Sequence, residues 1–256
     1  MRGVILAGGL GSRLLPVTRV TNKHLLPVYD RPMIYYPLQQ LVHAGIQDIL
    51  VVTGGNHAGD FLRLLGNGRQ FGLARLHYAY QEGEGGIAEA LALAEPFAEK
   101  EPLVVILGDN LFEQPIRPFV QGFGQTGSGA TVLLKAVDDP ERFGVAEIEE
   151  GRIARIVEKP TQPESNLAVT GCYIYDSRVF DLIRTVEPSS RGELEITDVN
   201  NQYVDDGQMH HHILSGWWTD AGTVPSLFRA TNLVESARDN PLLRGPAGFG
   251  AGASPA

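Results

Sequence analysis

The segment Met1–Leu14, MRGVILAGGLGSRL, sets an apolar run directly before a glycine-rich turn. No charged residue interrupts Gly3–Ala7, so this run predicts a buried strand. Gly8, Gly9 and Gly11 then fall within four positions. Glycine lets backbone N–H groups approach an anion closely, and a turn between a strand and a helix presents several of these donors together. The segment therefore indicates a phosphate-binding turn after the first strand of an α/β fold.

Two known turns of this kind fit the sequence poorly. A nucleoside-triphosphate P-loop needs Gly-x-x-x-x-Gly-Lys-Ser/Thr, whereas Ser12 and Arg13 follow Gly11 here. A dinucleotide-binding turn needs Gly-x-Gly-x-x-Gly, and Leu14 stands where the third glycine allows close helix packing. Asp30 has about the spacing of a ribose-binding acid, but it lies within PVYDRP rather than at a strand end. A dinucleotide-dependent dehydrogenase is therefore disfavoured.

The composition is typical of a globular protein, since 43% of the 256 residues are hydrophobic and 20% are charged. The formal net charge of −9 argues against binding to nucleic acid, which relies on many contacts of Lys and Arg with phosphate. Cys172 is the only cysteine, so neither an intrachain disulfide nor a cysteine-based metal cluster can form. We find neither a signal peptide nor an apolar run long enough to span a membrane, and we expect a cytoplasmic protein without membrane partners.

Short apolar strands alternate with amphipathic helices through the first half of the chain. The predicted strands are Gly3–Ala7, Asp48–Thr53, Leu76–Tyr80 and Leu103–Leu107, and the predicted helices are Pro32–Ala44, His57–Leu65 and Ile87–Ala98. Such alternation is typical of a mostly parallel sheet with helices on both faces. We therefore expect a three-layer α/β/α, Rossmann-like fold with a mixed sheet.

The pattern changes near residue 129, where strands follow one another closely. They are predicted at Ala130–Val137, Gly144–Glu149, Ile153–Val157 and Val169–Tyr175, and are followed by helices at Val179–Thr185 and Leu194–Asp205, a strand at Met209–Leu214 and a helix at Thr223–Ala237. This spacing predicts a small antiparallel insertion in a single domain spanning 1–240. The segment 241–256 is rich in Gly, Pro and Ala and predicts a flexible tail.

Several motifs together resemble those of a known family. The run Gly8–Thr18, with Lys23 and Leu25–Pro27, resembles the signature of the sugar-1-phosphate nucleotidylyltransferases, and KHLLPVYDRPMIYYPL (Lys23–Leu38) that of the glucose-1-phosphate thymidylyltransferase branch. The resemblance continues in order over about residues 1–240, at Gly108–Asn110, Glu158–Pro160, Val169–Gly171, Arg191–Asp198 and Asp220–Thr223.

The resemblance implies the nucleotide-diphospho-sugar transferase type of fold and a nucleotidyl transfer. A nucleotidyl group would pass from dTTP to α-D-glucose 1-phosphate, giving dTDP-glucose and pyrophosphate, with Mg²⁺ as cofactor. It further implies a homo-oligomer, a dimer or a tetramer. Residues 1–128 would mainly bind the nucleotide and residues 129–223 the sugar phosphate. Members often carry a further C-terminal helical segment with a regulatory nucleotide site, which we expect to be missing or reduced here.

Such a transfer brings two polyanions together, so the chain must supply positive charge. Arg13 is suited to the β- and γ-phosphates and the departing pyrophosphate, and Lys23 to the α-phosphate or the incoming sugar phosphate. Lys159 and Arg191 are candidates for binding the sugar phosphate, Arg191 through both arms of its guanidinium group. Taken singly, each would be an ordinary surface cation.

Two aspartates are the expected metal ligands. Asp109 follows the apolar run LVVIL at the carboxyl end of a predicted parallel strand, where open α/β sheets bind ligands. Asp220 lies in WWTDAGT before the last predicted helix. Mg²⁺ bound to phosphate prefers carboxylate oxygens, although either aspartate could instead stabilise a turn or cap a helix. The run His210–His212 is not expected to bind metal, because adjacent residues of a strand face opposite sides.

The remaining candidates divide between the two substrates. With Arg13, Lys23 and Asp109 as catalytic residues, the expected nucleotide contacts are Leu6, Gly8, Gly9, Gly11, Ser12, Arg13, Gln81, Gly86 and Asp109. The expected sugar-phosphate contacts are Lys23, Asn110, Gly144, Glu158, Lys159, Val169, Arg191 and Trp218. Gln81 could read the base with its amide, and Glu158 could accept two hydroxyl groups of the hexose.

Three positions depart from the family pattern and leave the base and the sugar open. The loop Glu82–Gly86, EGEGG, stands where the family has a Pro-rich stretch with an Asp before its last glycine. His24 stands where Gln is common, and Phe143 where Tyr is usual. UTP, CTP or another sugar 1-phosphate therefore remain alternatives for the same chemistry. A regulator that binds a nucleotide sugar without turning it over is the alternative from another class.

Overall fold

The computed structural model describes residues 1–243, apart from the side chain of Thr126. Its centre is a nine-stranded mixed sheet that contains four parallel strands in the order β6–β1–β4–β5. They are β1 (Arg2–Ala7), β4 (Asp48–Gly54), β5 (Arg75–Gln81) and β6 (Leu103–Leu107). Ile5 pairs with Val51 on one side and with Ile106 on the other, so β1 lies inside the sheet, as its apolar sequence predicts.

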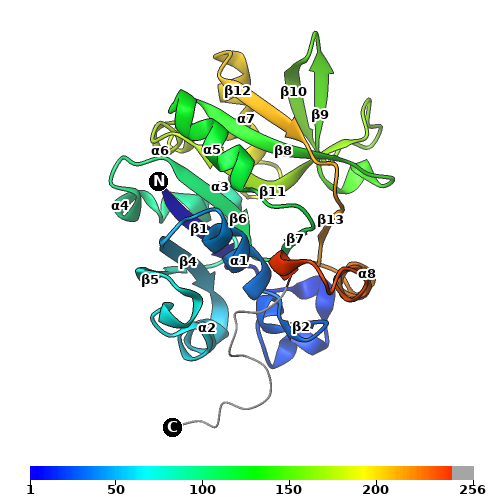
Figure 1. The fold of residues 1–256 in the computed structure, drawn as a ribbon. Helices are drawn as coiled ribbons and strands as arrows, with labels where there is room; N and C mark the ends of the chain where they lie inside the picture. Colours follow the sequence, from blue (N-terminus) through cyan, green and yellow to red (C-terminus); the bar gives the residue numbers. More distant parts are fainter. Residues whose placement is uncertain (244–256) are drawn as a thin grey trace.

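The sheet continues beyond β6 into the part drawn above it in Figure 1. Its strands are β8 (Ala130–Ala136), β9 (Gly144–Glu149), β10 (Arg152–Glu158), β11 (Leu167–Tyr175) and β12 (Met209–Ile213). Strand β11 is antiparallel to β6, β8 and β9, as the sequence predicts for this insertion. Strand β12 runs parallel to β8, so the added part is not wholly antiparallel.

Alternate residues of β1 enter two different cores, which is what a sheet covered on both faces requires. Val4 and Leu6 pack with one set of helices, namely α3 (Ile87–Ala92), α4 (Glu95–Ala98), α6 (Val179–Ile183) and α7 (Ile196–Asp205). Ile5 and Ala7 pack with the other set, namely α1 (Tyr35–His43), α2 (Ala58–Leu65) and α5 (Arg117–Thr126). The predicted three-layer α/β/α fold is thereby confirmed.

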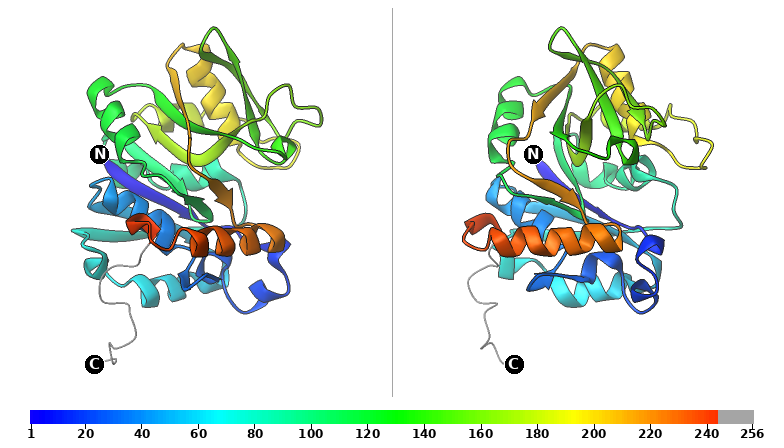
Figure 2. Two further views of the ribbon diagram at one scale, coloured as in Figure 1. Left: turned by 45° about the vertical axis from the view of Figure 1, so that its right-hand side comes forward. Right: turned by 90° about the vertical axis from the view of Figure 1, so that its right-hand side faces the viewer.

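Short elements join the two parts of the sheet. Strand β7 (Asn110–Phe112) directly follows β6 and pairs antiparallel with β13 (Trp218–Asp220). A second small pair consists of β2 (Pro27–Val28) and β3 (Arg31–Pro32). Helix α8 (Val224–Ser236) packs on β2 and β13 and lies along this boundary in Figure 2. These elements hold Asp109 and Asp220 at neighbouring positions.

Several boundaries differ from the sequence predictions for local reasons. The first helix begins at Tyr35 rather than at residue 32, because Arg31–Pro32 pair in β3. The helix predicted for 87–98 is divided into α3 and α4, since Pro96 in the first turn of α4 cannot donate to the preceding turn. Strands β7 and β13 were not predicted, nor was α5, whose sequence RPFVQGFGQT carries Pro and Gly.

Two further expectations concern the chain end and the membrane. Pro241–Leu243 form a short 3₁₀ turn, and Leu243 is buried in the core beneath α8, so the predicted flexible tail is wrong for these residues. The rest of the predicted tail, 244–256, lies outside the described residues. Among the described residues, no helix has the length and apolar character needed to cross a membrane.

Candidate active site

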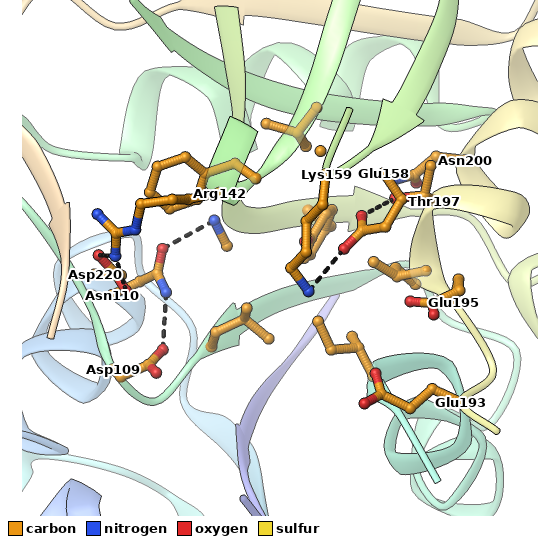
Figure 3. A pocket seen from close by; sticks show the side chains of 18 of the residues that line it. Asp109, Asn110, Arg142, Glu158, Lys159, Glu193, Glu195, Thr197, Asn200 and Asp220 are labelled. Atoms are coloured by element: carbon orange, nitrogen blue, oxygen red, sulfur yellow. Dashed lines mark hydrogen bonds and ion pairs between the residues drawn. The ribbon is translucent and has the colours of Figure 1, made fainter. Parts of the chain in front are cut away.

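Two adjoining cavities open at the carboxyl ends of the parallel strands. The larger, of about 580 Å³, is lined by the glycine-rich turn. The smaller, of about 170 Å³, lies by the ends of β9–β11 (Figure 3). Arg13, Asp109, Lys159 and Arg191 line both, so the two cavities form one continuous site.

All residues that the sequence predicts for the site line one or both cavities. Those found only in the larger are Leu6, Gly8, Gly9, Gly11, Ser12, Lys23, Gln81 and Gly86. Those found only in the smaller are Asn110, Gly144, Glu158, Val169, Trp218 and Asp220. The structure therefore brings the candidates together, while the role of each stays a prediction. His24, one of the three positions that depart from the family pattern, lines the larger cavity.

Two glycines of the turn have close neighbours where a side chain would lie. A Cβ atom at Gly8 would lie 2.5 Å from Gln81 Oε1, and one at Gly11 would lie 2.9 Å from the Cβ atom of Lys23. Gly11 also has a φ of +70°, which favours glycine. The backbone N–H of Leu10 donates to Glu84 Oε1 at 3.2 Å, and both residues line the larger cavity. A carboxylate thus already occupies one donor of the turn.

Lys23 and Asp109 form an ion pair at the meeting point of the cavities, with 2.5 Å between Nζ and Oδ2. Burial alone would raise the pKa of Asp109, but the Lys23 charge, the neighbouring His24 and the hydrogen bonds from Lys23 and Asn110 together outweigh it and hold this pKa far below its usual range. His24 lies beneath them, where burial and the nearby Lys23 charge lower its pKa to about 3, so it is neutral. Its ring Nδ1 lies 2.7 Å from Asn22 Oδ1.

The two candidate metal ligands converge. A Cβ atom built on Gly222 would lie 3.3 Å from Asp220 Oδ2 and 3.4 Å from Asp109 Oδ2, with an Arg13 nitrogen at 3.1 Å. Burial and the neighbouring Asp109 charge raise the pKa of Asp220, although Arg142 and Arg13 partly oppose this. Two carboxylates that disfavour each other's charge are suited to sharing a divalent cation.

Protein side chains alone do not complete a metal centre there. Within residues 1–243, no group of three or more His, Cys, Asp or Glu side chains is placed to hold a metal ion. His210–His212 lie on the strand β12. Mg²⁺ commonly binds through one or two carboxylates together with substrate phosphates, and the pair Asp109 and Asp220 fits that pattern.

Asn110 lines the smaller cavity and connects three parts of the site through its side-chain amide. Its Oδ1 accepts hydrogen bonds from the backbone N–H of Gly171 at 2.9 Å and from Trp218 Nε1 at 2.8 Å, and its Nδ2 donates to Asp109 Oδ1 at 2.9 Å (Figure 3). Asn110 is 3% exposed. The indole of Trp218 in turn packs edge-on against Phe143. These contacts show that Asn110 supports Asp109, while its expected contact with the sugar phosphate stays a prediction.

In the smaller cavity, two cationic side chains lie among carboxylates. Lys159 Nζ lies 3.1 Å from Glu158 Oε1, and Thr197 donates to the other Glu158 oxygen at 2.7 Å (Figure 3). Arg191 is bound by Glu195 at 2.7 Å and lies 3.3 Å from Glu158. Lys159 adopts a φ of +44°, and its backbone N–H donates to Phe143 O. The predicted sugar-phosphate cations are therefore present and are held in place by glutamates.

Backbone hydrogen bonds connect the loop Glu82–Gly86 to the segment after Arg191. Leu194 N donates to Gly85 O at 2.8 Å, and Ala88 N donates to Leu194 O at 3.2 Å. A Cβ atom at Gly86 would lie 2.6 Å from Leu194 O. The loops of the two cavities are thus attached to each other.

Some lining residues were missed by the sequence reasoning. Arg142, Glu193, Glu195, Thr197 and Asn200 all line the smaller cavity. Three of them lie inside the quoted motif Arg191–Asp198, so the motif itself was the available signal. Arg142 carries no such signal, and only its ion pair with Asp220, at 3.3 Å, reveals its place.

Comparison with known proteins agrees with this geometry. The chain belongs to the nucleotidyl transferase family, whose model matches residues 2–237. Within that family it is similar to glucose-1-phosphate thymidylyltransferases. The Neisseria gonorrhoeae enzyme is 47% identical over 93% of this chain and 84% of its own length, and the Actinoplanes enzyme is 48% identical over 92% and 78%.

Solved structures show the same likeness. A Bacillus anthracis protein assigned as a glucose-1-phosphate thymidylyltransferase, in complex with a sucrose, has a TM-score of 0.88 and 54% identity, covering 93% of this chain and 96% of that one. A UDP-glucose pyrophosphorylase in complex with UDP-glucose has a TM-score of 0.79 and 25% identity, covering 92% and 98%.

Proposed function

We propose that the protein transfers a thymidylyl group from dTTP to α-D-glucose 1-phosphate, giving dTDP-glucose and pyrophosphate. The observation that carries this proposal is the joining of a glycine-lined cavity to a cation-lined one around Lys23 and Asp109. The Neisseria and Actinoplanes relatives, which are named for this reaction, support the choice of substrates.

The chemistry needs positioning and positive charge rather than a proton relay. An oxygen of the sugar phosphate attacks the α-phosphorus of dTTP, and the new P–O bond forms as the bond to pyrophosphate breaks. The attacking oxygen is already anionic, so no general base is required. Charge grows on the α-phosphate oxygens and on the leaving pyrophosphate, and preorganised cations lower the barrier.

The chain's own residues divide this work. Arg13 neutralises the β- and γ-phosphates and the leaving group, and Lys23 faces the α-phosphate from its pair with Asp109. Lys159 and Arg191 bind the sugar phosphate at the boundary of the cavities. Glu158 accepts hydroxyl groups of the hexose. Residues 1–128 thus mainly bind the nucleotide, and residues 129–223 mainly bind the sugar phosphate.

Asp109 and Asp220 would hold the Mg²⁺ ion, because they present hard oxygen ligands that converge near Gly222. When bound, the ion would neutralise charge on the phosphate oxygens that it contacts.

The test is pyrophosphate release from dTTP, UTP and CTP with several sugar 1-phosphates, with and without Mg²⁺. We expect the highest kcat/KM for dTTP with glucose 1-phosphate and loss of the reaction when EDTA removes the metal. A regulator without catalytic activity is the second candidate, and release of no pyrophosphate from any pair, despite binding of dTDP-glucose, would establish it instead. The cytoplasmic location and the homo-oligomer stay predictions, the latter to be measured by sedimentation velocity.

A further inference from the structure

Gln81 lines the larger cavity and not the smaller one. Its Nε2 donates to Glu89 Oε2 at 2.8 Å and to Gly86 O at 3.3 Å. Both partners can only accept, so the amide cannot be turned around without losing both hydrogen bonds. Among the described residues, no donor bonds to Gln81 Oε1, which lies over Gly8 at the cavity. The amide therefore presents an acceptor, and no donor, to the ligand.

Gly85 leaves room for the Glu89 carboxylate that binds Gln81. A Cβ atom at Gly85 would overlap the Glu89 carboxylate, so a side chain at that position would displace it. The loop EGEGG and the carboxylate of Glu89 thus form one arrangement beside Gln81.

We propose that Glu89 is a positioning residue that determines base specificity, by fixing the Gln81 amide with its oxygen toward the base. Thymine and uracil offer an N3–H donor to this oxygen. Cytosine presents an unprotonated N3 there, and two acceptors facing each other in a closed site are unfavourable. The arrangement selects pyrimidines that carry N3–H. This inference rests on the proposed nucleotidyl transfer.

The decisive comparison is between dUTP and dCTP, which differ only in the hydrogen-bonding edge of the base. We expect wild-type kcat/KM to favour dUTP by at least about tenfold, because a mispaired buried polar group lowers kcat/KM for the wrong base by about this factor. In Glu89→Leu the side chain cannot accept the hydrogen bond from the Gln81 amide. The ratio of kcat/KM for dUTP to that for dCTP therefore falls by about tenfold, mainly through KM. Glu89→Gln keeps an acceptor oxygen and restores most of the preference. Glu82→Leu, on the neighbouring exposed residue, leaves the ratio unchanged.

Gly85→Ala tests the same contact without altering Glu89, and it keeps the measurement available if Glu89→Leu does not fold. The added methyl group displaces the carboxylate, and the ratio falls as in Glu89→Leu. A wild-type ratio near one, or variants with an unchanged ratio, would overturn the inference while the nucleotidyl transfer stands. If the wild type forms no nucleotide sugar from any triphosphate, the proposed function itself fails.

Discussion

Lys23 Nζ lies 2.5 Å from Asp109 Oδ2, so the cation expected at the α-phosphate is also the counter-ion of an expected metal ligand. Both side chains are largely buried, at 14% and 12% exposed. The pair explains why the pKa of Asp109 is low in spite of burial, which would otherwise raise it. Catalysis and stability therefore depend on the same contact.

Replacing Lys23 with Ala is expected to reduce kcat for pyrophosphate release by about 10²–10³-fold, the usual effect of losing one group that stabilises transition-state charge. It should also destabilise the fold by about 3–5 kcal/mol near neutral pH, because a buried carboxylate loses its partner. Without Lys23, burial raises the pKa of Asp109, so the folded state of the variant gains stability as pH falls toward 3.8, the ordinary value. Urea unfolding of both proteins across this range measures the effect. A deficit in stability that is constant with pH would contradict this account.

Gly8→Ala is expected to weaken nucleotide use, because its methyl carbon would lie 2.5 Å from Gln81 Oε1. We expect kcat/KM for the triphosphate to fall by at least about tenfold, as the displaced amide leaves polar atoms unpaired. Gly59→Ala is the matched control, since a Cβ atom there has no neighbour within 4 Å and lies in α2. The control should keep activity and gain about 0.5–1 kcal/mol of stability. Equal activity of the two variants would refute the role given to the turn.

Glu84→Ala should tighten nucleotide binding. The Glu84 carboxylate accepts the Leu10 N–H, which belongs to the turn expected to hold phosphate. An anionic triphosphate must displace it, so its removal should lower KM by about 2–5-fold, the range for a solvent-exposed charge effect. Glu82→Ala, nearby and exposed, controls for the general loss of negative charge. A higher KM in Glu84→Ala would instead mean that this carboxylate binds the nucleotide directly.

The raised pKa of Asp220 predicts a metal effect that depends on pH. Below its folded pKa the carboxyl is protonated and stabilises the fold, and this contribution is lost as pH rises from 3.8 through the folded value. A cation bound to the ionised carboxylate should reverse that loss. Thermal unfolding should therefore show a larger gain in Tm from Mg²⁺ at neutral pH than just above 3.8. Asp220→Asn should abolish the difference, and an undiminished gain in that variant would remove Asp220 from the metal site.

The sequence was sufficient for features carried by local pattern. Apolar runs predicted the parallel strands, and because parallel strands end at one edge of a sheet, Asp109 and the glycine turn could be placed together. The motifs that resemble the family, in their order along the chain, then supplied the remaining candidate residues. The structure places all of them around the two cavities.

Features that depend on distant partners could not be predicted. Asn110 bonds with residues 61 and 108 positions away, Gly171 and Trp218, so its supporting role is invisible in its own neighbourhood. Strands β7 and β13, of three residues each, are too short for any periodic signal. The contact of Gln81 with Glu89 is closer in sequence, but it depends on the path of a glycine-rich loop that no pattern specifies.

The hydrogen bonds between Leu194 and the loop Glu82–Gly86 have a consequence for how the two substrates bind. A glycine-rich loop loses conformational entropy when a ligand orders it. Because Leu194 is hydrogen-bonded to this loop, a ligand that orders the loop would also order the segment beside Arg191. The substrate that binds first should therefore carry most of this entropic cost. The second substrate should then bind with higher affinity than it does alone, with a measurable difference in binding enthalpy. Cooperativity between the substrates would then arise without a hinge or a moving domain.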